Sequence, residues 1–390
     1  MTKHTEALLS LSKLISPAFN DQNSCKEIVI SESTPWYEMI DFANQHLLIP
    51  TLYSMLEHKG LLSLFEDELI VEYLTTVYEF NRKRNEAIIM QLQDLCRLLS
   101  EIGVKPVLLK GAAALSEEYF YHVGARVMYD IDILVPESEI LKCIEYLASQ
   151  GGYKPVDSEA PEWMSHQYRS IYTENGIAAV ELHRHALIKK CYAYLPDDEL
   201  MKHVRPSKTI KNAFVLEPTY DLYHIFLHSE LQDSCHEKRT LALRGLHHAA
   251  VIATLCRDEM QWDTLATMIE RHGLDTIWGD YLYMLKRLFE LEIPSEMPGS
   301  QKHFQEIVDS IEENNTKEPK AFLYYCKRFK EALSYKTLKE SYDLQNRAAY
   351  PFAVIQSLFS MIFKYTFSSE ARKKLAKQHE HHKKSKKFGQ

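Results

Sequence analysis

The chain has 390 residues, of which 45% are hydrophobic and 26% are charged, a composition typical of a globular protein with two or three domains. Its formal net charge of −8 argues against a protein that wraps nucleic acid on a basic surface. No apolar run reaches the roughly 18–20 residues that span a bilayer, and no signal-peptide pattern is present. Seven widely spaced cysteines suit reduced thiols, so we expect a cytoplasmic protein.

The first region, residues 1–102, is expected to be helical. Apolar residues recur at helical spacing from Trp36 to Glu57, and Pro50 within this stretch can end one helix or begin the next. A longer pattern from Tyr73 to Ile102 predicts a helix with its apolar stripe toward the core. Gly103 then stands where a helix C-cap belongs.

The pattern changes to short strands in the second region, residues 103–216. The stretch VKPVLLKGAAAL predicts a strand, a turn and the start of a helix. A strand is predicted over Ala125 to Val135, where apolar residues alternate with Asp130 and Asp132. The next helix begins at Pro136-Glu137-Ser138 and closes at Gly151-Gly152.

A hairpin is predicted next, with strands over Tyr168 to Thr173 and Ile177 to His183. Its turn, Glu174-Asn175-Gly176, contains the Asn-Gly pair that is a strong hairpin signal between apolar runs. The second strand carries Glu181 between apolar neighbours, where a charged residue requires an explanation.

The rest of the chain is expected to be mainly helical. Residues 217–294 predict a helical domain. In it, His224 and His228 are one turn apart, and they are either core histidines or a contact to a nucleotide. Residues 295–370 predict a linker, polar over 295–320, and further helices near Ala321–Tyr335 and Pro351–Phe367. The basic tail, 371–390, is expected to be disordered, with contact to nucleic acid or an anionic membrane as its functional alternatives.

The candidate chemistry centres on Asp130 and Asp132. On a strand, residues i and i+2 share one face and lie ~7 Å apart. Two such carboxylates repel each other unless a cation lies between them. Mg²⁺, or Mn²⁺ in its place, prefers oxygen ligands, and a two-ion site supports attack on phosphorus. The structural alternative is a solvated strand edge.

Two further segments could complete such a site. Lys110-Gly111-Ala112 occupies a strand-to-helix turn, where a glycine lets backbone N–H groups approach a phosphate. Glu181 is the candidate third carboxylate, and His183 is expected beside the site or in contact with substrate. The alternatives are an ordinary turn glycine and a glutamate on an exposed strand face.

Together these segments resemble a known family. Leu108-Leu109-Lys110-Gly111, then Arg126 four residues before the Asp130-Ile131-Asp132 motif, then Val180-Glu181-Leu182-His183, are similar to the uncharacterised nucleotidyltransferase family of the polymerase-beta-type superfamily. The similarity extends from about Trp36 to Pro294.

The resemblance implies an α+β fold, in which a small mixed β-sheet core is embedded between N-terminal and C-terminal helical regions. It implies two Mg²⁺ or Mn²⁺ ions held by Asp130 and Asp132, with Glu181 as the third acid. The phosphates of a nucleoside triphosphate such as ATP would lie against the Gly111 turn, beside Lys110, Ala112 and Arg126.

The implied activity is transfer of a nucleoside monophosphate to a hydroxyl of an unknown acceptor, which could be a small molecule, a protein or an RNA. Superfamily members commonly carry a Gly-Ser pair at the turn, whereas Ala112 offers no hydroxyl. That departure keeps open a catalytically weak or inactive protein with a binding or regulatory role. A toxin-like enzyme that modifies a host or self target is a third alternative.

Overall fold

The structure is a computed structural model, and it describes residues 2–155, 166–168, 170–293 and 300–314. The chain divides into two compact units, Met1–Thr316 and Lys317–Gln390, and the described residues all lie in the first. The helices predicted near Ala321–Tyr335 and Pro351–Phe367, and the basic tail, lie outside the described residues.

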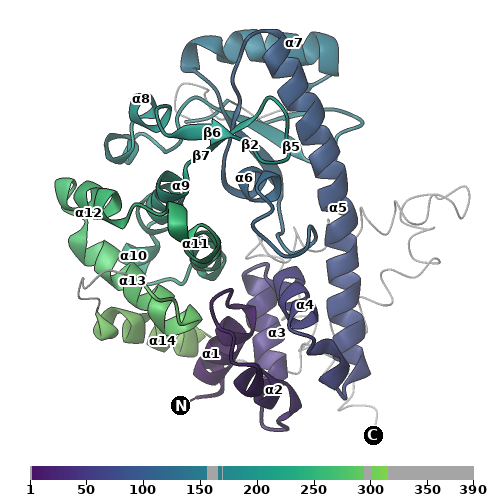
Figure 1. The fold of residues 1–390 in the computed structure, drawn as a ribbon, viewed down its shortest axis with the longest axis vertical. Helices are drawn as coiled ribbons and strands as arrows, with labels where there is room; N and C mark the ends of the chain where they lie inside the picture. The colour runs from purple at the N-terminus through teal and green to yellow at the C-terminus, as the bar shows by residue number, and fades with distance from the viewer. Residues whose placement is uncertain (1, 156–165, 169, 294–299, 315–390) are drawn as a thin grey trace, which may run out of the picture. The chain divides into compact units, whose positions relative to one another are not determined.

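The first unit combines many helices with one sheet (Figure 1). Its α-helices are α1 (Lys3–Ile15), α2 (Gln22–Ile30), α3 (Trp36–Gln45), α4 (Ile49–His58), α5 (Glu68–Glu101), α6 (Lys110–Ser116), α7 (Ile140–Gly151), α8 (Asp197–Leu200), α9 (Pro218–Phe226), α10 (Cys235–Lys238), α11 (Leu243–Leu255), α12 (Trp262–Arg271), α13 (Asp275–Phe289) and α14 (Gln301–Asn314). Its strands are β1 (Val107–Leu108), β2 (Asp130–Leu134), β3 (Lys154–Pro155), β4 (Ile171–Tyr172), β5 (Ala179–His183), β6 (Val204–Pro206) and β7 (Phe214–Leu216).

The described strands form one mixed sheet in the order β3-β4-β5-β2-β1-β7-β6. The central pair, β2 and β5, is parallel, and β1 runs antiparallel to β2. One face of this pair is apolar: Ile131, Ile133, Val180 and Leu182 are all buried in the main core cluster. The other face carries the acidic side chains, so the same two strands supply both core and candidate site.

Helix α5 covers the apolar face of the sheet. Its residues Ile88, Leu92, Leu95 and Leu99 are fully buried in the same core cluster as the strand residues. The N-terminal half of the helix contacts α4, and the rest contacts α6 and α7. This 34-residue helix therefore connects the N-terminal helices with the elements around the sheet (Figure 1). None of the described helices combines the length and apolarity needed to cross a membrane.

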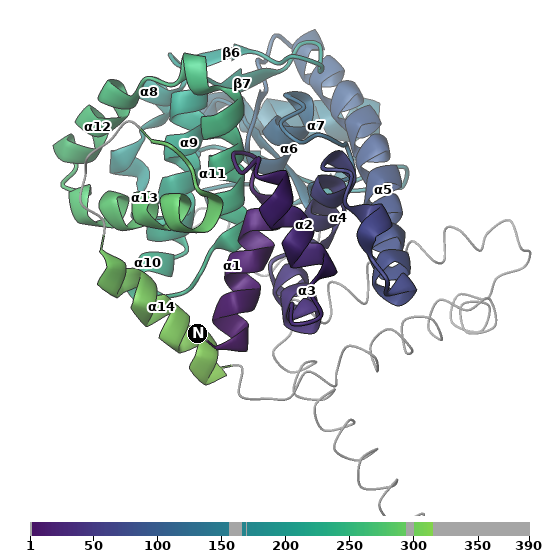
Figure 2. The same ribbon diagram turned by 60° about the horizontal axis from the view of Figure 1, so that its bottom comes forward.

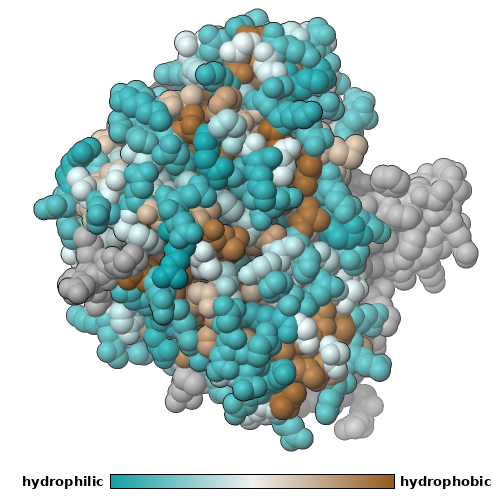
Figure 3. Space-filling model, in the orientation of Figure 1, coloured by the Kyte–Doolittle hydropathy of each residue, from teal (hydrophilic) through white to brown (hydrophobic). Residues whose placement is uncertain are grey.

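The N-terminal helices also contact the C-terminal ones. Helix α1 packs against α3 and α4 on one side and against α13 and α14 on the other (Figure 2). Hydrogen bonds fix this contact, since the Ser16 hydroxyl donates to the Phe289 carbonyl at 2.6 Å and Nε2 of His247 lies 2.9 Å from the Ile15 carbonyl. The face shown in Figure 3 is mainly hydrophilic, with apolar residues in small separate patches.

The α+β fold class is confirmed, and most predicted elements are present. Helix α4 begins at Ile49, with Pro50 in its first turn, and Gly103 follows α5 with a left-handed φ of 78°. The predicted strands exist but are shorter, because β2 covers only Asp130–Leu134 and β4 only Ile171–Tyr172. The boundaries predicted at 102, 216 and 294 lie inside the first unit and stay predictions.

The interpretation of 295–320 as a polar linker was wrong where α14 lies. This helix buries His303, Phe304, Ile307 and Val308, which recur at helical spacing within an otherwise polar segment. Two buried turns on one face are enough to dock it against α13 and α1, although the overall composition is polar.

Candidate active site

The register between β2 and β5 sets the site. Asp132 pairs directly with Glu181, and Leu134 pairs with His183, on adjacent parallel strands. Paired residues on neighbouring strands project to the same face, and so do residues two apart on one strand. Asp130, Asp132, Glu181 and His183 therefore gather on the face opposite the apolar core, and the alternation in the sequence had predicted this shared face for Asp130 and Asp132.

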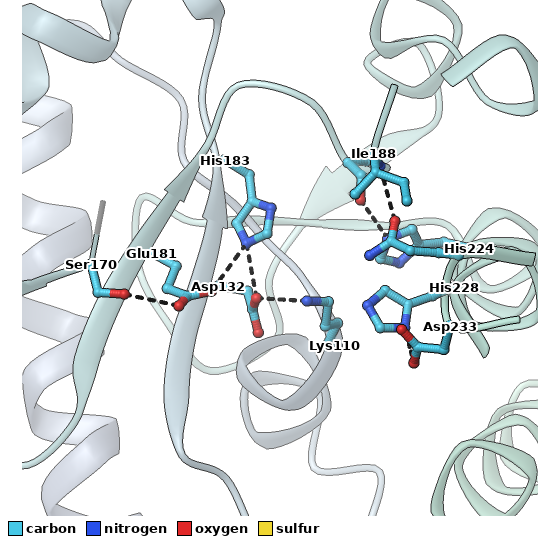
Figure 4. A network of polar contacts seen from close by, with 11 residues as sticks. Lys110, Asp132, Ser170, Glu181, His183, Ile188, His224, His228 and Asp233 are labelled. Atoms are coloured by element: carbon cyan, nitrogen blue, oxygen red, sulfur yellow. Dashed lines mark hydrogen bonds and ion pairs between the residues drawn. The ribbon is translucent and has the colours of Figure 1, made fainter. Parts of the chain in front are cut away.

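Asp132 is the most enclosed of the acids, with 3% of its surface exposed. Its Oδ1 accepts a hydrogen bond from the Lys110 ammonium at 2.8 Å and lies 2.9 Å from Nε2 of His183 (Figure 4). Burial by itself would raise the pKa of Asp132, but the Lys110 charge and the His183 contact outweigh burial and hold the pKa well below its usual range. Asp132 is therefore ionised at neutral pH.

Asp130 behaves differently because it has less compensating charge. Burial, followed by repulsion from Asp132 and Glu181, raises the pKa of Asp130 to about 6. Glu181 is held by the Ser170 hydroxyl, which donates to Oε1 at 2.9 Å, and its Oε2 lies 3.9 Å from Nε2 of His183. Three acids on one face thus carry more negative charge than Lys110 alone offsets.

This donor set fits a divalent cation. Ligand atoms of Asp132, Glu181 and His183 lie within 4.8 Å of one another, and Asp130 is two residues along the same strand face. Carboxylate oxygens are the ligands that Mg²⁺ and Mn²⁺ prefer. The nitrogen of His183 that faces the acids is Nε2. Its other nitrogen, Nδ1, is buried and has no hydrogen-bond partner among the described residues.

The turn before α6 is held by packing as well as by backbone geometry. Lys110 adopts a left-handed φ of 51°, which is uncommon for a residue other than glycine and turns its side chain toward Asp132. A Cβ atom added at Gly111 would lie 2.7 Å from Cγ of Met128. Ala112 is fully buried, and its N–H donates to the Leu109 carbonyl at 3.1 Å. The phosphate-binding role of this turn stays a prediction.

Polar side chains of α5 hold the loop that leads to Asp130. Asn81 donates to the Gly124 and Arg126 carbonyls at 2.7 and 2.9 Å, and Asn85 also donates to the Arg126 carbonyl at 2.7 Å. Arg84 donates to the Met128 carbonyl at 2.6 Å. The sequence interpretation missed these residues. Their signal was the position of two asparagines on the core-facing stripe of a long amphipathic helix.

Arg126 lies in this loop, and its side chain is partly exposed. Its Nε is buried without a hydrogen-bond partner among the described residues. Burial, followed by repulsion from Arg244, lowers the pKa of Arg126 to about 9, while Asp132 and Asp130 attract it. The guanidinium of Arg126 thus lies near two carboxylates, and its Nε makes no hydrogen bond. It is therefore a candidate to bind an anionic ligand.

The helical elements supply a further wall of the site, of which the sequence indicated only His228, as one of two alternatives for a nucleotide contact. Figure 4 shows His228 and Asp233 on the side of Lys110 that faces away from Asp132. His228 lies in a short π-helix, Leu227–Gln232, and its Nδ1 is 3.4 Å from Oδ2 of Asp233. Such π-helical insertions are frequent at functional sites.

Two further polar residues of the helical elements, His224 and Arg244, have different surroundings from those of His228. His224, one of the two histidines singled out in the sequence, is fully buried and its Nε2 lies 3.2 Å from the Ala186 carbonyl, so it is a core histidine. Arg244, at the start of α11, is close enough to Asp130, Asp132 and Asp233 for its charge to interact with them, although burial lowers its pKa. The wall thus adds a second guanidinium to the site.

Comparison with known proteins identifies a family that covers most of the chain. The family described as "Uncharacterised nucleotidyltransferase" matches residues 32–290, a range that contains the site and both of its walls. No curated protein and no solved structure matches the chain.

Proposed function

The chain belongs to the uncharacterised nucleotidyltransferase family, and we propose that it is a Mg²⁺-dependent enzyme that moves a nucleoside monophosphate from a nucleoside triphosphate to an acceptor hydroxyl. One observation supports this most. Asp132 and Glu181 are in register on parallel strands beside Asp130, whose pKa is raised to about 6 by burial and by the other two acids. Bound divalent cations would offset the mutual repulsion of the three carboxylates.

Asp130, Asp132 and Glu181 would hold the ions, of which Mn²⁺ is an alternative to Mg²⁺. When bound, the ions would neutralise the triphosphate and lower the pKa of the attacking hydroxyl. His183 would fix the orientation of Asp132 through its Nε2, in the way that outer residues position metal ligands. Glu181, oriented by Ser170, is the candidate base for the acceptor proton.

The cationic side chains would bind the donor. Lys110, Arg126 and Arg244 lie near the carboxylates in different parts of the chain, and together they offer three positive charges to the anionic triphosphate. On donor binding, Lys110 would exchange its bond to Asp132 for a phosphate oxygen. Positioning and charge neutralisation would then supply most of the rate enhancement, as in other phosphoryl chemistry.

The acceptor would enter between the sheet and the helical wall. His228 and Asp233 lie on the helical side of Lys110, and a histidine oriented by a carboxylate can hydrogen-bond a hydroxyl group. Small molecules, proteins and RNA all carry hydroxyl groups, so we propose a hydroxyl as the accepting group without choosing among these three classes of acceptor.

A binding protein without activity is the second candidate. The buried Ala112, whose amide is already engaged, and the Lys110 ammonium on Asp132 favour it, because both reduce what the site offers to phosphates and cations. Retention of three clustered acids favours the enzyme, since an inactive scaffold gains nothing from their mutual repulsion.

The test is calorimetric binding of each of the four nucleoside triphosphates, with and without Mg²⁺, to the full chain and to Asp132→Asn. Asparagine keeps a hydrogen-bond acceptor for Lys110 and His183, so this variant preserves more contacts than alanine would. We expect Mg²⁺-dependent binding that is lost in Asp132→Asn and kept in Asp94→Asn, an exposed acid on α5. Binding that ignores Mg²⁺, or survives in Asp132→Asn, would contradict the proposed site.

A further inference from the structure

We propose that His236, Asp280 and His303 form a separate Zn²⁺ site that ties α14 to α10 and α13. Each residue comes from a different helix, and their ligand atoms lie within 4.8 Å of one another. No residue of the candidate active site takes part. The proposal therefore does not depend on the nucleotidyltransferase activity.

Asp280 is the centre of the cluster and is 5% exposed. Its Oδ2 lies 3.0 Å from Nε2 of His236 and 4.0 Å from Nδ1 of His303. Its Oδ1 accepts the backbone N–H of Ser300 at 2.8 Å, which fixes the orientation of the carboxylate. One carboxylate oxygen is thus anchored while the other faces two imidazoles, the arrangement that outer hydrogen bonds give to metal ligands.

An ion pair with Asp280 does not account for the buried position of His303. It is 8% exposed, its buried Nε2 has no hydrogen-bond partner within the described residues, and its Nδ1 is too far from Asp280 for a hydrogen bond. A buried ring nitrogen without a partner is costly, and a bound ligand would offset that cost.

The two imidazole rings lie side by side. They stack with centroids 4.2 Å apart and an interplanar angle of 19°. Both rings are thus next to the free carboxylate oxygen of Asp280.

The ligand set selects the metal class. Two imidazole nitrogens and one carboxylate oxygen suit Zn²⁺, which takes His and Asp ligands at ~2.0–2.2 Å and completes its tetrahedron with water. Mg²⁺ and Ca²⁺ prefer all-oxygen sites. Partial exposure of the His236 side chain, 22%, leaves a route for the ion from solvent.

The experiment must first remove two competing places for Zn²⁺. The tail carries His379, His381 and His382, and the candidate active site carries Asp132 with Glu181 and His183. A background variant of the full chain therefore replaces the three tail histidines by alanine and Asp132 by asparagine. After treatment with a chelator and its removal, Zn²⁺ is titrated into this background by calorimetry, and the bound metal is counted by elemental analysis.

We expect one tightly bound Zn²⁺ per chain in the background variant and a rise in Tm of about 2–4 °C or more. Adding His303→Ala or Asp280→Asn should weaken binding by on the order of 100-fold. Adding His272→Ala, a partly buried histidine at the end of α12, should change nothing. Circular dichroism and Tm in the presence of chelator establish that each variant is folded.

His236→Asn serves as a second variant, because its side chain is the most exposed of the three and its loss disturbs the packing least. In the metal-free background, Co²⁺ should give a visible absorption band that Zn²⁺ abolishes. A folded background that binds no Zn²⁺, or tight binding that survives both His303→Ala and His236→Asn, would overturn the proposal.

Discussion

The Lys110 ammonium lies 2.8 Å from Oδ1 of Asp132, inside the group of acids proposed to hold divalent cations. In the structure the lysine therefore supplies part of the positive charge that bound ions would supply. A side chain of this length, on a residue at the first position of α6, can also reach a phosphate group. Lys110 is thus expected to alternate between the acid and the donor.

Lys110→Met tests this exchange. Without the ammonium the acids are more negative, so binding of Mn²⁺ alone should tighten by on the order of tenfold, whereas binding of the Mg²⁺–triphosphate complex should weaken by a similar factor. Calorimetry measures both affinities, and Lys142→Met on the exposed face of α7 is the control. Changes of the same sign in both affinities would count against the exchange.

Arg126→Met and Arg244→Met test donor binding from the loop and from the helical wall. A charge-assisted hydrogen bond contributes about 1.5–3 kcal/mol, so each variant should bind triphosphate at least about tenfold more weakly, with a smaller dependence on salt. Arg97→Met, at an exposed position of α5, should bind as the wild type does. If Arg244→Met also binds normally, the helical wall does not contact the donor.

Gly111→Ala tests the packing reason for the turn glycine. The added Cβ would meet Cγ of Met128 at 2.7 Å, so the variant should lose about 1–3 kcal/mol of unfolding free energy in denaturant titrations. Combining it with Met128→Ala should cost less than the sum of the two single changes, because the cavity accepts the new methyl group. Gly245→Ala in α11 is the matched control, since its nearest atom is 3.7 Å away. Strict additivity would exclude the collision.

Asp221→Asn tests a buried carboxyl on α9 that is 2% exposed and has no hydrogen-bond partner for Oδ1 among the described residues. Burial, followed by repulsion from Glu117, raises its pKa to about 7. A carboxyl whose pKa is higher in the folded state than in the unfolded state destabilises the protein increasingly as pH rises from about 4 to about 7. Relative to wild type, Asp221→Asn should therefore gain about 2–3 kcal/mol of unfolding free energy between pH 5 and pH 8. A difference between the two proteins that does not change with pH would contradict this pKa.

The sequence predicted the elements with strong local signals. Alternation placed Asp130 and Asp132 on one strand face, and the Asn-Gly turn paired β4 with β5, which carries Glu181. The direct pairing of Asp132 with Glu181 could not be predicted, because periodicity in one strand does not determine its neighbour or its register.

Residues that reach the site from distant helices were also beyond local patterns. Asn81 and Asn85 resemble ordinary polar positions in a helix until the loop near Arg126 is placed beside them. The place of Arg244 depends on how α11 packs against the sheet, and the choice between His224 and His228 depends on the packing of the π-helix, which are tertiary arrangements rather than sequence signals. Helix α14 was missed for the opposite reason, since its apolar stripe is only two turns long.

The long helix α5 also bears on how this protein can be divided. Its apolar stripe completes the core under β1, β2 and β5, while Asn81, Arg84 and Asn85 fasten the loop that leads to Asp130. A fragment that began at residue 103 would carry every predicted acid and yet expose the underside of its own sheet. The segment that carries the candidate site is therefore not an autonomous module, and a shortened version of this chain would have to retain α5 to keep the proposed site in place.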